Sequence, residues 1–242
     1  MNEKLSAPFF EIGPKNLLRQ CDLRELLRAA EDAGAREHVA MIVTLPAVEI
    51  EAAKRLFPGL LAFAQHMDPD RPGPSVGRVI AEALADIGAD GVMLNHAQRP
   101  LAKDKLVLAV DRAKANGLLT MVCARDDLEA LFLAELGPDI LLYEPPALIG
   151  HSGGAARPWI SEIDLRVSAI NQDIKMMHAG GIGTPADARS VMLQGAAGTG
   201  ATSAIVLAPD RTAAVDAFVS ATRYGWRENA KRLVEVDKIK DA

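Results

Sequence analysis

Several residues that can carry acid–base chemistry lie directly after short apolar runs. They are Lys15, the pair Gln65–His66, the pair Asn95–His96, Glu144 and His178. A glutamate, a histidine and a lysine together supply a base, an electrophile and a fixed cation. Each of these side chains alone could be an ordinary structural residue. Their recurrence at the ends of successive apolar runs predicts a shared site.

Three glycine-rich stretches lie in the part of the chain that follows Glu144. They span residues 150–154 (GHSGG), 178–185 (HAGGIGTP) and 198–203 (GTGATS). Backbone N–H groups of such loops can hold an anion, because no side chain keeps the ligand away. The stiff pair Pro145–Pro146 before residues 150–154 favours a lid over a ligand. Each stretch could instead be an ordinary tight turn, so glycine alone is a weak signal.

The elements that must position these groups alternate along the chain. Apolar runs bounded by turn residues predict buried parallel strands over residues 8–12, 39–45, 60–65, 91–95, 118–123, 140–144, 175–179 and 202–207. Helical stretches lie between them; Leu23, Leu26, Leu27 and Ala30, for example, share one helix face. Eight units in 242 residues average about 30 residues each, the size of a strand–helix repeat.

Two architectures fit this alternation, a closed (β/α)8 barrel and an open doubly wound sheet. The open sheet with a dinucleotide site should show Gly-x-Gly-x-x-Gly after its first strand. The sequence there is Gly13-Pro14-Lys15-Asn16. The sequence therefore predicts an α/β barrel formed as one domain by residues 1–242, with the chemical groups at the carboxyl ends of the strands.

Composition excludes several classes of function. The net charge of −5 argues against a protein that binds nucleic-acid phosphates, and 4% aromatic residues leave few stacking surfaces. No apolar run reaches the roughly 18 residues that would span a membrane. The start, MNEKLSAPFF, lacks the apolar core of a signal peptide, which predicts a cytoplasmic protein. The only cysteines, Cys21 and Cys123, form neither a disulfide framework nor a metal motif.

Four stretches carry a resemblance to a known family. They are AQHMDPDRPGPSVGRVIAEAL at 64–84, GVMLNHAQRPL at 91–101, LTMVCA at 119–124 and LGPDILLYEPPALIG at 136–150. With a looser match at 178–188 (HAGGIGTPADA), the chain resembles the shorter, archaeal-type triosephosphate isomerases from about residue 8 to 225. The resemblance implies the TIM-barrel fold and an aldose–ketose isomerase acting on a small phosphorylated sugar.

The resemblance also implies roles for individual residues. Glu144 would be the base, His96 the electrophile and Lys15 the cation that stabilises an enediolate. Around the substrate we expect Asn95, Gly150, His151, His178, Gly180, Gly181 and Ser203. This chemistry needs no metal or cofactor. Relatives associate through a loop that corresponds to residues 66–77, so a homodimer or homotetramer is expected.

The sequence departs from the family pattern around these groups. Gly13 replaces an asparagine, Ala97-Gln98 replaces Ser-Glu, and Ala147, His151, His178 and Ala204 stand where other residues are usual. These changes favour an isomerase for a related substrate, such as a tetrulose phosphate, over one for a triose phosphate. They leave open whether Ala97, Gln98, Ala147 and Ala204 change the substrate or abolish activity.

Two other functions stay open at this point. One is a metal-dependent sugar isomerase or epimerase on the same barrel, with ligands drawn from His66, Asp68, His96, Glu144 and His178. The other is a catalytically inactive barrel that binds a ligand.

Overall fold

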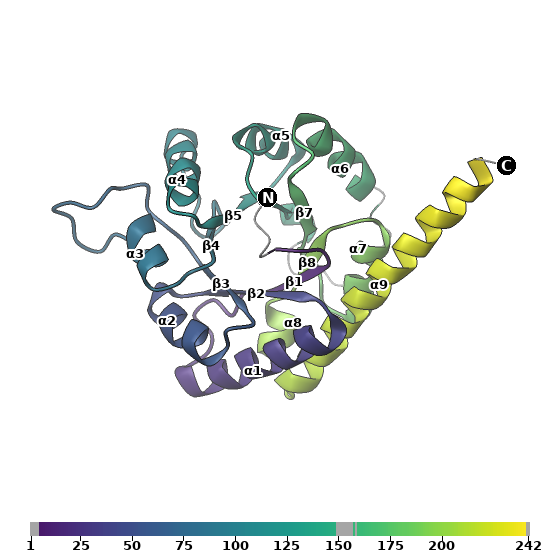
Figure 1. Cartoon of the computed structure of the whole chain (residues 1–242), viewed down its shortest axis with the longest axis horizontal. Helices are drawn as coiled ribbons and strands as arrows, with labels where there is room; N and C mark the ends of the chain where they lie inside the picture. The colour runs from purple at the N-terminus through teal and green to yellow at the C-terminus, as the bar shows by residue number, and fades with distance from the viewer. Residues whose placement is uncertain (1–4, 149–156, 158, 241–242) are drawn as a thin grey trace.

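The computed structural model describes residues 5–148, 157 and 159–240, and its centre is a closed parallel barrel. The strands are β1 (Phe9–Ile12), β2 (Ala40–Leu45), β3 (Leu61–Ala64), β4 (Gly91–Leu94), β5 (Leu119–Ala124), β6 (Ile140–Tyr143), β7 (Lys175–His178) and β8 (Gly198–Gly200). Each pairs with the next, and β8 pairs with β1, so the sheet closes (Figure 1). The predicted (β/α)8 barrel is confirmed.

Helices surround the strands (Figure 1). They are α1 (Gln20–Glu37), α2 (Ala47–Leu56), α3 (Ala81–Asp86), α4 (Lys103–Ala115), α5 (Asp127–Leu136), the 3-10 helix η1 (Pro146–Leu148), α6 (Trp159–Ile170), α7 (Pro185–Leu193), α8 (Ser203–Val206) and α9 (Arg211–Lys240). Helix α9 packs against α1 and α7, and its last turns extend past the barrel (Figure 1). Within the described ranges, no helix is long and apolar enough to cross a membrane.

The strands are buried on both faces, as parallel barrel strands must be. In β1, Phe9 belongs to the cluster that fills the barrel, together with Phe63 and Met177. The next residue, Phe10, faces the helices and contacts the ring of Phe218 on α9, with 6.1 Å between centroids. Alternate residues of a strand therefore face the interior and the helix layer.

The eighth predicted strand was wrong. The apolar run at 202–207 contains the short helix α8, and the strand that closes the barrel is the preceding Gly-Thr-Gly of β8. A Cβ on Gly198 would lie 2.2 Å from the Phe9 ring, so the interior leaves no space for a side chain there. A strand made of such small residues lacks the apolar pattern by which the others were found.

Candidate active site

The three predicted catalytic side chains come together at the carboxyl ends of β1, β4 and β6. Lys15 follows β1, His96 follows β4 and Glu144 follows β6. The Lys15 ammonium lies close enough to the other two to affect the pKa of each. A cation, an imidazole and a carboxyl group therefore share one electrostatic environment at this end of the barrel.

Lys15 is held in an unusual backbone conformation. Its φ of 51° lies in the left-handed region, which costs energy for a residue with a Cβ. Its carbonyl oxygen accepts a hydrogen bond of 2.9 Å from Nε2 of Gln65, which follows β3. Gln65 was singled out with the rim residues, and the structure shows that it fixes the turn that carries Lys15.

The imidazole of His96 has a defined tautomer. Its Nδ1 accepts a hydrogen bond of 3.1 Å from the backbone N–H of Gln98, so Nδ1 carries no proton. Nε2 then carries the proton and is free to donate. Burial, and secondly the Lys15 charge, lower the pKa of His96, which keeps the ring neutral. A neutral imidazole of this kind can polarise a carbonyl group.

Asn95 directly precedes His96 and fixes the start of the loop that carries it. The residue is buried, and its φ is 59°. Its Nδ2 donates to the Cys123 carbonyl at 3.0 Å and to Oε1 of Glu129 at 2.9 Å, while its Oδ1 accepts from the Leu101 N–H at 3.2 Å. Its amide group is thus committed to three protein partners. Both Nδ2 protons are used in these bonds, so among the described contacts Asn95 acts as a support of the site.

Glu144 is the candidate base. It directly follows β6, and its backbone N–H donates to the Ala124 carbonyl at 2.9 Å, which continues the sheet pairing by one residue. Burial raises the pKa of its carboxyl group, and the Lys15 charge opposes that shift. A raised pKa makes the carboxylate a stronger base at neutral pH.

A second carboxyl group near the site was missed by the sequence reading. Glu11 lies within β1 and is buried, and its pKa is affected by Glu144 and Lys15. The other candidates lie at the ends of apolar runs, whereas Glu11 lies inside one. A charged residue in the middle of the run FFEI was the signal that could have found it.

The glycine loop after β7 has free backbone amides. Gly180 and Gly181 have φ values of 79° and 67°, and in the described ranges neither N–H makes a hydrogen bond. Ser203 is the first residue of α8, so its N–H has no acceptor within that helix. The start of α7 differs, because Asp187 and Thr184 form a capping box that already engages its amides. An anion would therefore find free amides at Gly180, Gly181 and Ser203, and not at the N-terminus of α7.

Comparison with known proteins identifies the family of the chain. The family model described as triosephosphate isomerase matches residues 15–218. The chain belongs to the triosephosphate isomerase family.

Individual relatives cover most of the chain. The triosephosphate isomerase of Methanoculleus marisnigri is 31% identical over 198 residues, which are 80% of this chain and 89% of the relative. That of Cenarchaeum symbiosum is 29% identical over 219 residues, 89% and 98% of the two chains. The crystal structure of triosephosphate isomerase from Bartonella henselae matches with a TM-score of 0.71 at 20% identity, over 88% of this chain and 99% of that one, and supports the fold.

In this member of the triosephosphate isomerase family, the expectation that His178 contacts the substrate is wrong. His178 is fully buried, and its Nε2 lies 2.7 Å from Oδ1 of Asp164 on α6. Its ring packs against those of Tyr143 and Trp159. Because Met177 faces the barrel interior, the side chain of His178 faces the helix layer and does not reach the rim. Two other expected contacts, Gly150 and His151, lie outside the described residues.

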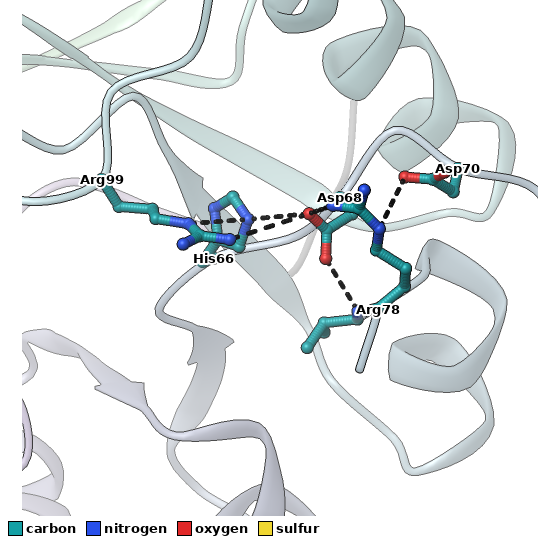
Figure 2. Close-up of polar contacts among 6 residues, drawn as sticks. His66, Asp68, Asp70, Arg78 and Arg99 are labelled. Atoms are coloured by element: carbon teal, nitrogen blue, oxygen red, sulfur yellow. Dashed lines mark hydrogen bonds and ion pairs between the residues drawn. The ribbon is translucent and has the colours of Figure 1, made fainter. Parts of the chain in front are cut away.

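The residues named for a metal-dependent mechanism do not gather around one point. Oδ1 of Asp68 instead lies 3.1 Å from Nη1 of Arg78, 3.4 Å from Nε2 of His66 and 3.9 Å from Nη2 of Arg99. Figure 2 shows this cluster. Burial opposes its ionisation, but the Val79 N–H and these partners outweigh burial and lower its pKa. In the described ranges no group of three or more His, Cys, Asp or Glu residues could hold a metal ion. Nothing described here favours the metal-dependent alternative.

Proposed function

We propose that the chain is an aldose–ketose isomerase, an intramolecular oxidoreductase, that interconverts the two forms of a triose phosphate. The observation that carries the proposal is the convergence of Lys15, a neutral His96 and a Glu144 with a raised pKa at one end of the barrel. The chemistry then needs no redox partner, because a hydrogen and an electron pair move within one molecule.

Each of the three groups has a role that follows from its state. The Glu144 carboxylate removes a proton from the carbon next to the carbonyl group, and His96 donates a hydrogen bond from Nε2 to the carbonyl oxygen. Lys15 stabilises the negative charge of the enediolate. Glu144 returns the proton to the neighbouring carbon, while His96 gives its Nε2 proton to the former carbonyl oxygen and takes up the hydroxyl proton of the other oxygen, which becomes the new carbonyl group. This division of labour is the one established for triosephosphate isomerase itself.

The phosphate group would bind at the amides of Gly180, Gly181 and Ser203. Backbone N–H groups suit an anion in this loop because glycine lets the ligand approach closely. Gly150 would add to this site, as the family resemblance implies. Ala204 is the neighbour whose methyl group departs from the family pattern at this point.

The length of the sugar, a triose or a tetrulose, is a separate part of the proposal. The departures from the family pattern favour a longer sugar such as a tetrulose phosphate, and His178 is one of those departures. Its burial against α6 removes that support. The relatives carry the name triosephosphate isomerase. We therefore favour the triose phosphate.

The test combines a substrate panel with a base variant and a matched control. Glyceraldehyde 3-phosphate and a tetrulose phosphate are compared by kcat/KM for the wild type, Glu144→Gln and Glu135→Gln, the last an exposed glutamate on α5. Loss of the base should lower kcat by about 10²–10⁴-fold, and the control should match the wild type. Faster turnover of the tetrulose phosphate would reverse the substrate assignment, and an active Glu144→Gln would overturn the mechanism.

Assembly and location are further proposals. The loop between β3 and α3 projects from the barrel (Figure 1), and Val76 within this loop is 96% exposed. An exposed apolar residue there fits a homodimer or homotetramer formed through residues 66–77. Sedimentation of the wild type and of Val76→Asp would test this assembly. We also propose a cytoplasmic location for the enzyme.

A further inference from the structure

Glu11 places a carboxyl group inside the barrel, directly beneath the proposed site. Phe9, two residues earlier in β1, faces the interior, so Glu11 faces it too and lies one layer closer to the carboxyl ends of the strands. The side chain is only 8% exposed. A buried carboxyl group in this position is costly unless it is neutral or well paired.

Two glycines provide the space that the carboxyl group occupies. A Cβ on Gly13 would lie 2.9 Å from Oε1 of Glu11, and a Cβ on Gly200 would lie 2.9 Å from Oε2. Gly13 is also the position where the family resemblance leads us to expect an asparagine. The Glu11 carboxyl group therefore fills the space that a side chain at residue 13 would need.

The groups that face Glu11 come from several strands. Lys15 and Glu144 affect its pKa from the rim, and Glu11 in turn affects the pKa of Cys123 on β5. From β2, the buried Thr44 hydroxyl lies beside the carboxyl group and favours its ionised form, but without a well-formed hydrogen bond. Among the described residues, the Glu11 carboxyl group makes no other side-chain hydrogen bond, which leaves hydrogen-bonding capacity at the floor of the site.

The arrangement of charges decides which carboxyl group keeps a proton. Lys15 affects both carboxyl groups, and Glu11 is more buried than Glu144. Desolvation, and to a lesser extent the charge of Glu144, raise the pKa of Glu11 to about 7, against the opposing effects of Thr44 and Lys15. Glu144 is thus the better carboxylate, and Glu11 is the better carboxylic acid.

We propose that Glu11 is a further catalytic residue, a neutral carboxylic acid that donates a hydrogen bond to the substrate oxygen on which negative charge develops in the enediolate. No proton needs to be transferred from Glu11 in this role. The donor acts as an oxyanion-stabilising group alongside Lys15 and His96. The proposal rests on the isomerase function above.

Two variants of similar length separate donation from ionisation. Glu11→Gln keeps an N–H donor and cannot ionise, whereas Glu11→Met keeps the length and has no donor. The measurement is kcat and KM for glyceraldehyde 3-phosphate from pH 5 to pH 9, with circular dichroism to confirm that each variant is folded.

Three results are expected if Glu11 donates. The wild type loses kcat/KM as the pH rises through about 7, and Glu11→Gln lacks that decline while staying within a few-fold of the wild type at pH 6. Glu11→Met loses about 10²-fold or more in kcat at every pH, with a smaller change in KM. Infrared difference spectra between wild type and Glu11→Gln show the loss of a carboxylic acid C=O band at pH 6.

The outcomes that contradict the proposal are distinct from failure of the isomerase function. Identical pH profiles for wild type and Glu11→Gln, or a folded Glu11→Met with wild-type kcat, would overturn the role of Glu11 alone. A wild type that turns over none of the sugar phosphates in the panel would overturn the proposed function and the catalytic role of Glu11 with it.

Discussion

Replacement of Asn95 by alanine should destabilise the protein and displace His96. The alanine removes three hydrogen bonds and leaves the buried Cys123 carbonyl and the partly buried Leu101 N–H without these partners. The third partner, Glu129, keeps its bonds to Arg125. Because the Leu101 N–H is only partly buried, each orphaned group is assigned about 1–2 kcal/mol, so the loss of bonding costs about 2–4 kcal/mol.

The backbone at residue 95 adds a second contribution. Alanine tolerates a φ of 59° less well than asparagine does, at a cost of about 1 kcal/mol. The free energy of unfolding from urea titrations should therefore fall by about 3–5 kcal/mol in total. Asn95→Gly is the matched control, since it loses the same bonds without the backbone penalty and should be about 1 kcal/mol more stable than Asn95→Ala.

Activity should fall with stability, because a shift of about 1 Å in a catalytic group costs on the order of 10²-fold in rate. The reasoning is refuted if the free energy of unfolding of Asn95→Ala lies within about 0.5 kcal/mol of the wild-type value. It is also refuted if kcat is unchanged in a variant that loses the full stability, because Asn95 would then not position His96.

Two further predictions concern the barrel interior. Gly198→Ala should lower the free energy of unfolding by about 1–3 kcal/mol, since its Cβ would lie 2.2 Å from the Phe9 ring. The control Gly73→Ala should be near neutral, because its Cβ would meet only the Arg71 carbonyl, at 3.8 Å. Equal effects of the two changes in urea denaturation would contradict the packing argument. Because the pKa of Glu11 is raised in the folded state, protonation of this carboxyl group stabilises the folded protein. This contribution to the free energy of unfolding is full below pH 4.5 and is lost as the pH rises through about 7. Wild-type stability should therefore decline relative to Glu11→Gln by about 3 kcal/mol between pH 4.5 and pH 8, and parallel stability curves would contradict the assigned pKa.

The sequence was sufficient for the barrel and for the three catalytic candidates. Strand ends are visible as apolar runs that stop at turn residues, and Lys15, His96 and Glu144 lie just beyond three of them. The type of each side chain then indicated its chemistry. The structure brings these residues together, while their roles stay a proposal.

What the sequence could not show was the direction of side chains within a strand. Parallel barrel strands are buried on both faces, so the run KMMH does not reveal that Met177 faces inward and His178 outward. Glu11 was missed for the related reason that its position relative to Gly13 and Gly200 is set by the closed barrel. Those three residues meet only through the pairing of β1 with β8.

That pairing also determines the order in which the protein can be completed during synthesis. Of the eight strands, β1, which carries Glu11 and leads to Lys15, emerges first from the ribosome, and its partner β8 emerges last. Until then β1 presents an unpaired edge, the kind of exposed edge that invites pairing with another chain. Translation therefore joins the two sides of the site in a single late step, and a nascent chain that stops before β8 has neither a closed barrel nor a floor beneath the site.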